Sequence, residues 1–144
     1  MSESNWRKLS RVNVDHGVEV KHGGLKYLSW SVAWASLMEH FPTSTYEWLE
    51  PIILRDETVM VRVAVTVKGL RHEMQLPVLD HRNKPIANPN AFDYNSAQVR
   101  CLCKAIAMHG IGISLYMGDM KTVVTESGYE KAQALIDAGD AVAF

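Results

Sequence analysis

Two neighbouring segments of the chain alternate between apolar and more polar side chains, and a Lys-Gly pair separates them. In the first segment, Thr58–Lys68, the inward positions are Val59, Val61, Val63, Val65 and Val67. In the second segment the alternation continues through Leu70, His72, Met74, Leu76 and Val78. A period of two places such residues on one face of each strand. Because Lys68-Gly69 allows only a tight turn, the strands must pair as an antiparallel hairpin with one buried face.

A further strand is predicted just before this hairpin, over Tyr46–Leu54. Pro51 lies within it and predicts an edge position or a bulge, because proline cannot donate a hydrogen bond to a neighbouring strand. The connection to Thr58 is short, so the three strands should form an antiparallel meander.

A helix is predicted upstream of the strands, over Trp30–Phe41, with Ser29 as its N-cap and Pro42 ending it. Its apolar positions have the spacing of one helical face and are Trp30, Ala33, Trp34, Leu37, Met38 and Phe41. An aromatic stripe could stack on a ligand, but this periodicity is typical of core packing. We therefore assign the stripe to the core.

A second helix is predicted over Tyr94–His109, capped by Asp93 and closed by Gly110. A polar loop rich in asparagine and proline precedes it, from residue 80 to residue 92. Arg100 and Lys104 lie four residues apart and therefore share one side of this helix.

The two cysteines, Cys101 and Cys103, lie on the same helix but point in directions roughly 160° apart. They can neither form a disulfide with each other nor share a metal ion, so we assign them to buried packing positions. Beyond the helix, Ile111–Tyr116 predicts a short strand and Gly128–Ala138 a last helix.

The elements follow in the order αβββα, an α+β pattern for one domain of 144 residues. Residues 1–24 should form an N-terminal arm with at most a short strand near Val18–Val20, residues 25–119 the core, and residues 120–144 the C-terminal helix and tail. No apolar run approaches the roughly 18 residues of a membrane span. The first residues carry no hydrophobic signal segment, which predicts a cytoplasmic protein.

The net charge is -1, yet the positive charge is concentrated in the middle of the chain. Residues 55–104 carry eight Lys or Arg against five Asp or Glu, whereas residues 105–144 carry two against five. This asymmetry fits local binding of a polyanion, although a modest gradient also arises by chance.

The sequence offers no catalytic constellation, metal-ligand spacing or nucleotide-binding loop. Its six histidines share no HxxxH or HxH spacing, and neither GxxxxGKS/T nor GxGxxG occurs. Asp80 and His81 could form an acid–base pair, but adjacent residues in a loop usually point apart. We therefore expect a binding protein with no catalytic residue, no metal and no cofactor, rather than an enzyme.

What remains is a set of cations and one amide in the middle of the chain. They are Arg62, Lys68, Arg71, Arg82, Asn83, Lys84, Arg100 and Lys104. One interpretation is a solvated charged face with salt bridges to Glu57, Glu73 and Asp80. The other is a groove between sheet and helix whose cations follow a phosphate backbone, with Asn83 bonding to phosphate or sugar. Spacing alone leaves both interpretations open.

At these residues the chain resembles a family of phage single-strand annealing proteins. YLSW at residues 27–30 and AW at 33–34 are similar to the opening of that family, and LPVLDHRNKPI at 76–86 resembles its LPVMDxRNKxI block. FDYN at 92–95 and RCLCKAIAMHGIG at 100–112 are similar to its FDIN and RCLVKAIALHGLG blocks. The blocks occur in the family's order and cover about residues 11–119. The resemblance is to the Sak-type group of the wider Rad-type annealing superfamily.

The resemblance implies a three-stranded meander packed on a long helix, with an N-terminal and a C-terminal helix, in subunits that assemble into rings or helical filaments. It implies ATP-independent binding of single-stranded DNA and annealing of complementary strands in phage homologous recombination. The setting would be the cytoplasm of a bacterial host. Candidate partners are further copies of the chain, a phage exonuclease and a single-strand-binding protein, with no membrane.

On this basis we expect Arg82, Lys84, Arg100 and Lys104 to form one wall of a single-strand groove, with Arg62 and its hairpin as the other wall. Three alternatives stay open. The chain could be a module for RNA or another polyanion without annealing activity, a small enzyme that uses Asp80 and His81, or a structural oligomer without a ligand.

Overall fold

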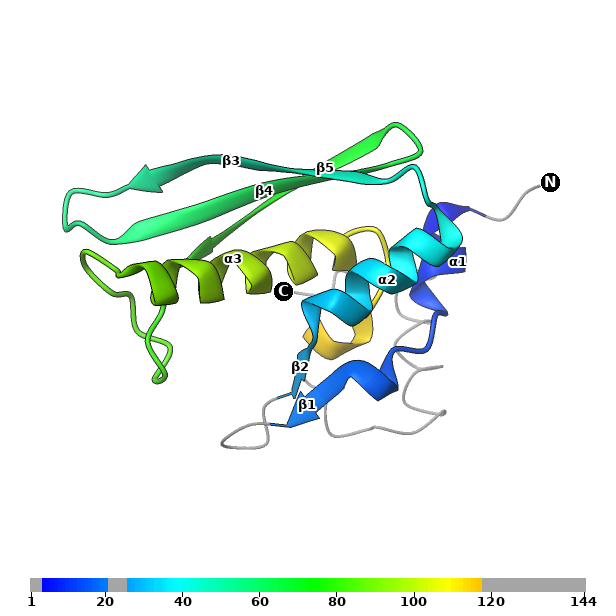
Figure 1. Ribbon diagram of the computed structural model, residues 1–144, viewed down its shortest axis with the longest axis horizontal. Helices are drawn as coiled ribbons and strands as arrows, with labels where there is room; N and C mark the ends of the chain where they lie inside the picture. The colour runs from blue at the N-terminus through cyan, green and yellow to red at the C-terminus, as the bar shows by residue number, and fades with distance from the viewer. Residues whose placement is uncertain (1–3, 21–25, 118–144) are drawn as a thin grey trace.

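The computed structural model describes residues 4–20 and 26–117 and shows a sheet with helices beneath one of its faces (Figure 1). Three strands form an antiparallel meander, with β4 (Val59–Val67) between β3 (Thr45–Ile53) and β5 (Leu70–Pro77). The predicted three-stranded meander is therefore confirmed, with strand ends that differ by one residue from those expected.

The other elements lie on one side of this sheet. Helix α3 (Ala91–Ala107) runs along the sheet, and α2 (Trp30–His40) crosses below it near one end (Figure 1). A separate antiparallel ribbon joins β1 (Val18–Val20) to β2 (Lys26–Leu28). The remaining pieces are short helices, namely α1 (Asn5–Ser10), η1 (Asp15–Gly17) and η3 (Ile113–Tyr116).

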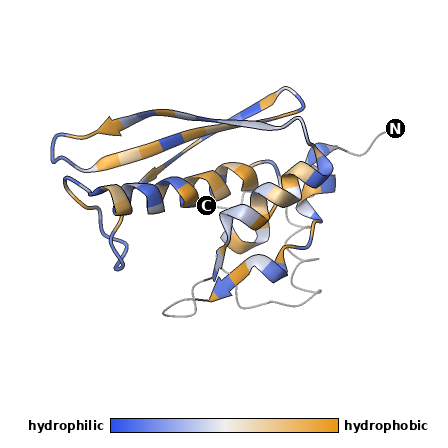
Figure 2. Cartoon of the chain, in the orientation of Figure 1, coloured by the Kyte–Doolittle hydropathy of each residue, from blue (hydrophilic) through white to orange (hydrophobic). Residues whose placement is uncertain are grey.

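The inward face of β4 is the centre of the core. Val61, Val63, Val65 and Val67 are all at most 1% exposed. Each fully buried valine contributes about 1.5–3 kcal/mol relative to an exposed one. Along α3 the ribbon alternates between hydrophobic and hydrophilic segments (Figure 2), because only one side of this helix faces the sheet.

Small side chains let α3 approach the sheet closely. Ala97, Cys101 and Ala105 follow one another at intervals of four residues and are buried. The Cys101 thiol donates a hydrogen bond to the Met74 carbonyl oxygen, with Sγ 3.4 Å away. Near the end of the helix, the Nε2 atom of the buried His109 lies 2.9 Å from the Val65 carbonyl oxygen. These contacts fix the helix against both β4 and β5.

Several local predictions are confirmed. The helix at Trp30 begins where expected and ends at His40, just before Pro42. The register between β3 and β4 shifts between Leu49 and Ile52, so Pro51 lies at a bulge on an edge strand. The short strand expected near residues 18–20 is present as β1.

The start of α3 was predicted wrongly. The helix begins at Ala91, and its N-cap is Asn90, whose side-chain oxygen accepts a 2.8 Å hydrogen bond from the Asp93 backbone N–H. Asp93 thus lies in the first turn, where its negative charge complements the helix dipole. Asparagine and aspartate are equally good N-caps. The sequence therefore did not show whether Asn90, which follows Pro89, or Asp93 caps the helix.

The strand expected at residues 111–116 is also wrong, because this segment forms the 3-10 helix η3. Gly110 and Gly112 have φ values of +128° and +74° and turn the chain back over the ribbon. A Cβ atom at Gly110 would lie 2.7 Å from the Ser10 backbone nitrogen, so α1 packs directly against this turn. The apolar residues of this segment are still buried, and Ile111 is 0% exposed, but the segment adopts a turn and a 3-10 helix instead of a strand.

Two other expectations differ from the structure. Within the predicted N-terminal arm, Leu9 and Val14 belong to the hydrophobic core, so the described part of that segment is folded against the rest. Trp30 was assigned to the core but is 47% exposed, whereas Ala33 and Leu37 on the same helix are buried. The last helix predicted at residues 128–138 lies outside the described residues.

We expect the stability of the protein to fall on acidification because of His109. Burial lowers the pKa of this histidine below its usual value near 6.5, and the adjacent ring of His72, 4.5 Å away between centroids, acts in the same direction. The unfolded chain therefore takes up a proton in a range where the folded chain does not. Stability should be retained above about pH 6.5 and lost as the pH falls below it, by on the order of 1 kcal/mol.

Urea denaturation of the wild type and of His109→Gln at about pH 7.5 and about pH 5.5 measures this effect. The variant should be less stable at the higher pH but should show a smaller loss between the two. His16→Gln, at an exposed histidine, is the matched control. An identical pH dependence in all three proteins would show that His109 is not responsible.

Candidate nucleic-acid interface

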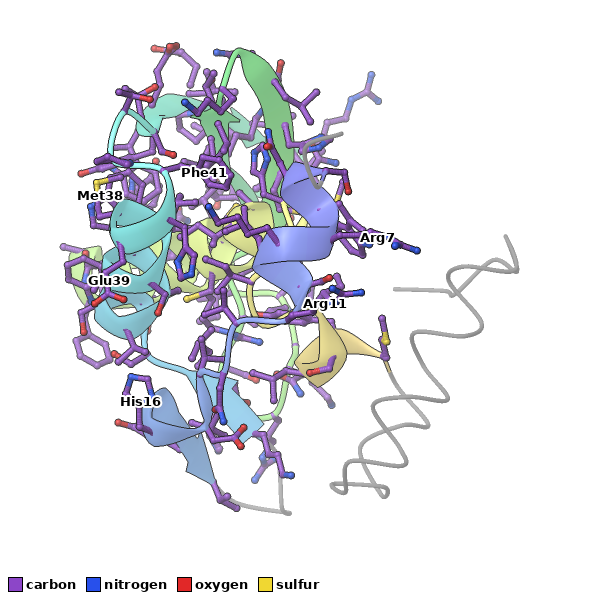
Figure 3. All side chains as sticks on the ribbon, turned by 90° about the vertical axis from the view of Figure 1, so that its right-hand side faces the viewer. Arg7, Arg11, His16, Met38, Glu39 and Phe41 are labelled. Carbon is purple, nitrogen blue, oxygen red and sulfur yellow. The ribbon has the colours of Figure 1, made fainter. Side chains whose placement is uncertain are left out.

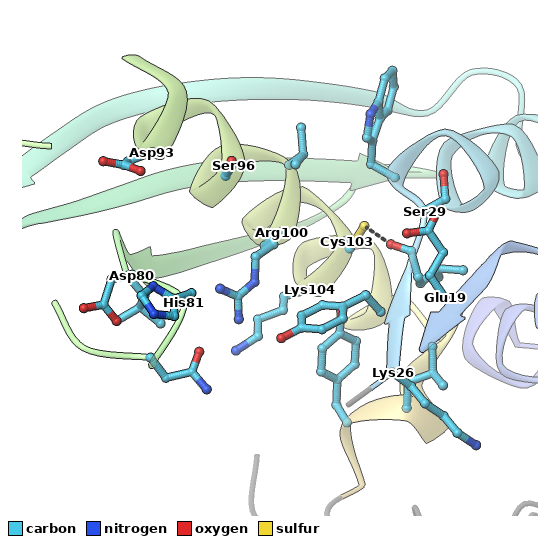
Figure 4. Close-up of a pocket in the computed structure, with 18 of the residues that line it drawn as sticks. Glu19, Lys26, Ser29, Asp80, His81, Asp93, Ser96, Arg100, Cys103 and Lys104 are labelled. Atoms are coloured by element: carbon cyan, nitrogen blue, oxygen red, sulfur yellow. Dashed lines mark hydrogen bonds between the residues drawn. The ribbon is translucent and has the colours of Figure 1, made fainter. Parts of the chain in front are cut away.

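A cavity of about 1200 Å³ lies between α3, the loop that follows β5, and the β1–β2 ribbon (Figure 4). We call it the α3 groove. Pockets for small molecules usually hold about 300–1000 Å³. The α3 groove is larger than this, so it suits a segment of an extended ligand better than a compact metabolite.

One stripe of α3 forms the first wall of the groove. Its residues recur at helical intervals and are Phe92, Asp93, Ser96, Val99, Arg100, Cys103 and Lys104. Arg100 and Lys104 project from the helix into the same space (Figure 4). The opposite stripe of the helix, with Cys101, packs on the sheet. The sheet thereby fixes the direction in which the two cations point.

The second wall is a tight turn in the loop after β5, which the sequence predicted as a cationic segment. The Asp80 carboxylate accepts hydrogen bonds from the backbone N–H groups of Arg82, at 2.8 Å, and Lys84, at 3.0 Å. Asn83 has a φ of +60°, a conformation that asparagine tolerates better than most residues. Asn83 lines the groove, while Arg82 and Lys84 beside it are exposed.

Asp80 therefore has a structural role that the sequence did not indicate. The backbone N–H of Lys84 makes the largest contribution to lowering the pKa of this carboxyl group, with that of Arg82 adding to it. The carboxylate stays ionised at neutral pH, and its oxygen is engaged in closing the turn. This geometry favours a turn-forming aspartate over the acid–base pair with His81.

The third wall comes from β2, the start of α2 and η3. The Arg100 guanidinium carbon lies 5.5 Å from the centre of the Tyr27 ring, and the Lys104 ammonium lies 5.8 Å from that of Tyr116. Both distances are in the range of cation–π attraction. Burial raises the pKa of Tyr116, so its hydroxyl stays neutral. The two rings thus contact the cations, and no carboxylate among the described residues forms a salt bridge with either of them.

The charge of the groove is balanced rather than strongly positive. Among the described lining residues, Lys26 accompanies the two cations of α3, while Glu19, Asp80 and Asp93 carry negative charge. Arg82 and Lys84 are two further, exposed cations in the loop that contributes Asn83, but they do not line the groove. Such a groove would attract an anionic polymer locally and weakly, and salt would screen the attraction.

The hairpin cations do not form the opposite wall, and that prediction is wrong. The alternation of β4 places Arg62 on the face of the sheet away from α3, because its neighbours Val61 and Val63 face the helix. Arg62 forms a salt bridge with Glu73 at 3.4 Å, and Arg71 pairs with Glu73 at 3.5 Å and with Glu47 at 3.7 Å. On this outer face Arg62 and Arg71 thus form the kind of salt bridge to Glu73 that one interpretation of the sequence expected, and their binding of nucleic acid stays a prediction.

Lys68 lies away from the α3 groove as well, in the turn between β4 and β5. Its ammonium group is 5.9 Å from the centre of the Phe41 ring, and that of Lys8 is 5.2 Å from the same ring. Phe41 directly follows α2, and Figure 3 views this end of the molecule. Of the eight residues predicted from the sequence, Asn83, Arg100 and Lys104 line the groove, and Arg82 and Lys84 are exposed neighbours of Asn83 in the chain.

Sequence reasoning missed the aromatic part of the site. Phe92 could have been found by extending the Arg100 stripe two helical turns towards the N-terminus. Trp30 had the spacing of a core residue, and only its exposure in the fold corrects that assignment. Tyr27 and Tyr116 reach the groove from distant parts of the chain, so no local pattern could have indicated them.

The cysteines do not add reactive groups to the groove. Burial raises the pKa of Cys101 to about 12 and that of Cys103 to about 11, so both thiols stay protonated at neutral pH. The Cys103 thiol donates a hydrogen bond to the Leu28 carbonyl oxygen, with Sγ 3.4 Å away.

Within residues 4–20 and 26–117, no three His, Cys, Asp or Glu side chains are grouped as a metal site would need. Over the same residues, none of the helices combines the length and the apolar character that a membrane span requires.

Comparison with family models identifies a match over most of the chain. A search of curated proteins and a search of solved structures found no significant similarity. The model of the Sak single strand annealing protein family matches residues 4–135, which includes the three walls of the α3 groove and nearly the whole chain. The family resemblance seen in the sequence blocks is thereby confirmed, and the chain belongs to the Sak single strand annealing protein family.

Proposed function

We propose that the protein binds single-stranded DNA in the α3 groove and anneals it to a complementary strand without ATP. Membership of the family supports the general activity. One observation supports this location. Arg100 and Lys104 lie on the same stripe of α3 and both point into the groove, beside the cationic turn at residues 80–84. Cations at such spacing can follow successive phosphates of one strand.

Annealing at this site would require no chemical step. Phosphate contacts hold the first strand, and the hydrogen-bonding edges of its bases stay available to a second strand. Correct pairing then stabilises the duplex through stacking, whereas mismatched strands dissociate. We therefore propose a non-enzymatic mechanism in which the protein lowers the cost of bringing two anionic strands together.

We further propose that several copies act together as a homo-oligomer, a ring or a helical filament. The balanced charge of one groove makes each phosphate contact weak, and aligned grooves would add such contacts along one strand at high effective concentration. An exposed apolar segment supports an interface between copies. Ile52, Ile53 and Leu54, at the end of the edge strand β3, are 40%, 70% and 48% exposed.

The biological setting that we propose is homologous recombination of a phage in the cytoplasm of a bacterial host. A nuclease that exposes single strands would supply the substrate, and a single-strand-binding protein would compete for it. A phage exonuclease and such a protein are therefore the proposed partners.

Removing the two α3 cations should weaken DNA binding for all sequences alike. We expect Arg100→Ala/Lys104→Ala to reduce the affinity for single-stranded oligonucleotides and to reduce the slope of log affinity against log salt by about 1.4, since each phosphate contact contributes about 0.7. Titrations by fluorescence anisotropy at several salt concentrations measure both quantities.

The matched control is Arg62→Ala/Arg71→Ala, which removes the same charge from the outer face of the sheet. It should leave the salt slope near the wild-type value. Equal losses in the two double variants would show that net charge, rather than the α3 groove, controls binding. Competition by single-stranded RNA in the same titration tests the alternative of a general polyanion module.

A charge at the tip of β3 should disrupt the proposed assembly. Ile53→Asp is expected to shift the mass of the particles in solution towards that of the monomer, while Ile53→Val should keep the wild-type mass. Mass photometry or sedimentation measures the distribution. Because Ile53 is mostly exposed, the aspartate should leave the fold intact, and an unchanged mass in Ile53→Asp would exclude this segment as the interface.

A further inference from the structure

Two large aromatic side chains of the α3 groove are exposed to solvent. Trp30, at the start of α2, is 47% exposed, and Phe92, in the first turn of α3, is 78% exposed. Both line the groove. Exposed aromatic rings in a concave surface mark a place where a ligand supplies the missing contact.

The other aromatic rings of the groove are already engaged. Tyr27 and Tyr116 lie against Arg100 and Lys104, so their contacts position the cations. Trp30 and Phe92 make no ring or cation–π contact with another side chain in the part of the chain that the structure describes. Phosphate contacts explain the presence of Arg100 and Lys104, but they give no role to these two rings.

The spacing along α3 fits a short run of nucleotides. Phe92 and Arg100 are eight residues apart, which is about 12 Å along a helix axis, and Lys104 is about 6 Å further. A stacked strand rises about 3.4 Å per nucleotide. About three to four stacked nucleotides would therefore separate a base at Phe92 from a phosphate at Arg100. Ser96 lies between them and leaves room for the strand.

We propose that the α3 groove binds nucleobases as well as phosphates, with Trp30 and Phe92 each stacking on a base. This inference rests on the proposed function and specifies its ligand as an unpaired strand with accessible base faces. Every base has a π face, so such stacking tolerates any sequence. A duplex keeps its base faces covered and cannot make these contacts. Stacking uses the face of a base and leaves its pairing edge open to a complementary strand.

The test compares oligothymidylate with an abasic oligonucleotide of the same length and charge, bound to the full chain at several salt concentrations. Wild-type protein should bind oligothymidylate at least about fivefold more tightly for each stacked base. Trp30→Ala and Phe92→Ala should each lose about that factor on oligothymidylate, with an unchanged salt slope. They should lose almost nothing on the abasic strand. Trp30→Phe keeps a stacking ring and should retain most of the affinity.

The outcomes separate this inference from the proposed function. If oligothymidylate and the abasic strand bind equally and both alanine variants behave as wild type, stacking is wrong, although loss of binding in Arg100→Ala would still support the groove. If no single strand binds at all, the proposed function itself is wrong. If Trp30→Ala or Phe92→Ala changes the mass of the particles but not the base dependence, these rings belong to an interface between copies, which also overturns the inference. Circular dichroism of each variant confirms that it is folded.

Discussion

The packing of α3 on the sheet is the interaction on which the rest of the structure depends. The helix can approach β4 and β5 closely because Ala97, Cys101 and Ala105 form its inner stripe. Cys101 on the helix and His109 two residues beyond its end add hydrogen bonds to strand carbonyl groups. Rotation of α3 about its axis would expose this stripe and break both contacts. The outer stripe, with Arg100 and Lys104, therefore keeps one direction, fixed by the buried inner stripe.

This arrangement gives the two faces of the sheet different properties. On the outer face, arginines and glutamates on neighbouring strands neutralise one another, as Arg62 and Glu73 do. Exposed pairs of this kind contribute about 0–1 kcal/mol each, so they serve mainly to keep that face solvated. On the helix side, Arg100 and Lys104 lie against the aromatic rings of Tyr27 and Tyr116. Their charge is thus available to an anionic ligand, which is the basis of the proposed function.

The fold was more predictable from the sequence than the site, for a physical reason. Strand alternation and helical spacing are local, so the meander, α2 and the cationic side of α3 could be derived from residues close together in the chain. The turn at Gly110 and Gly112 overrode the strand preference of residues 111–116, because two left-handed glycines redirected the segment. Arg62 was predicted to form a wall of the groove but lies on the outer face of the sheet, because counting charges does not consider which face of a strand a residue occupies. Tyr27 and Tyr116 join the groove only through tertiary packing, and Trp30 was misassigned because periodicity cannot report exposure.

The central claim is that the α3 groove anneals complementary strands by holding one of them. The most direct measurement is the rate at which two complementary oligonucleotides pair in the presence of the protein, without ATP or added metal. We predict that the wild type accelerates pairing well above the spontaneous rate, that Arg62→Ala/Arg71→Ala does so equally, and that Arg100→Ala/Lys104→Ala does not. Full acceleration by Arg100→Ala/Lys104→Ala at moderate salt would contradict the account.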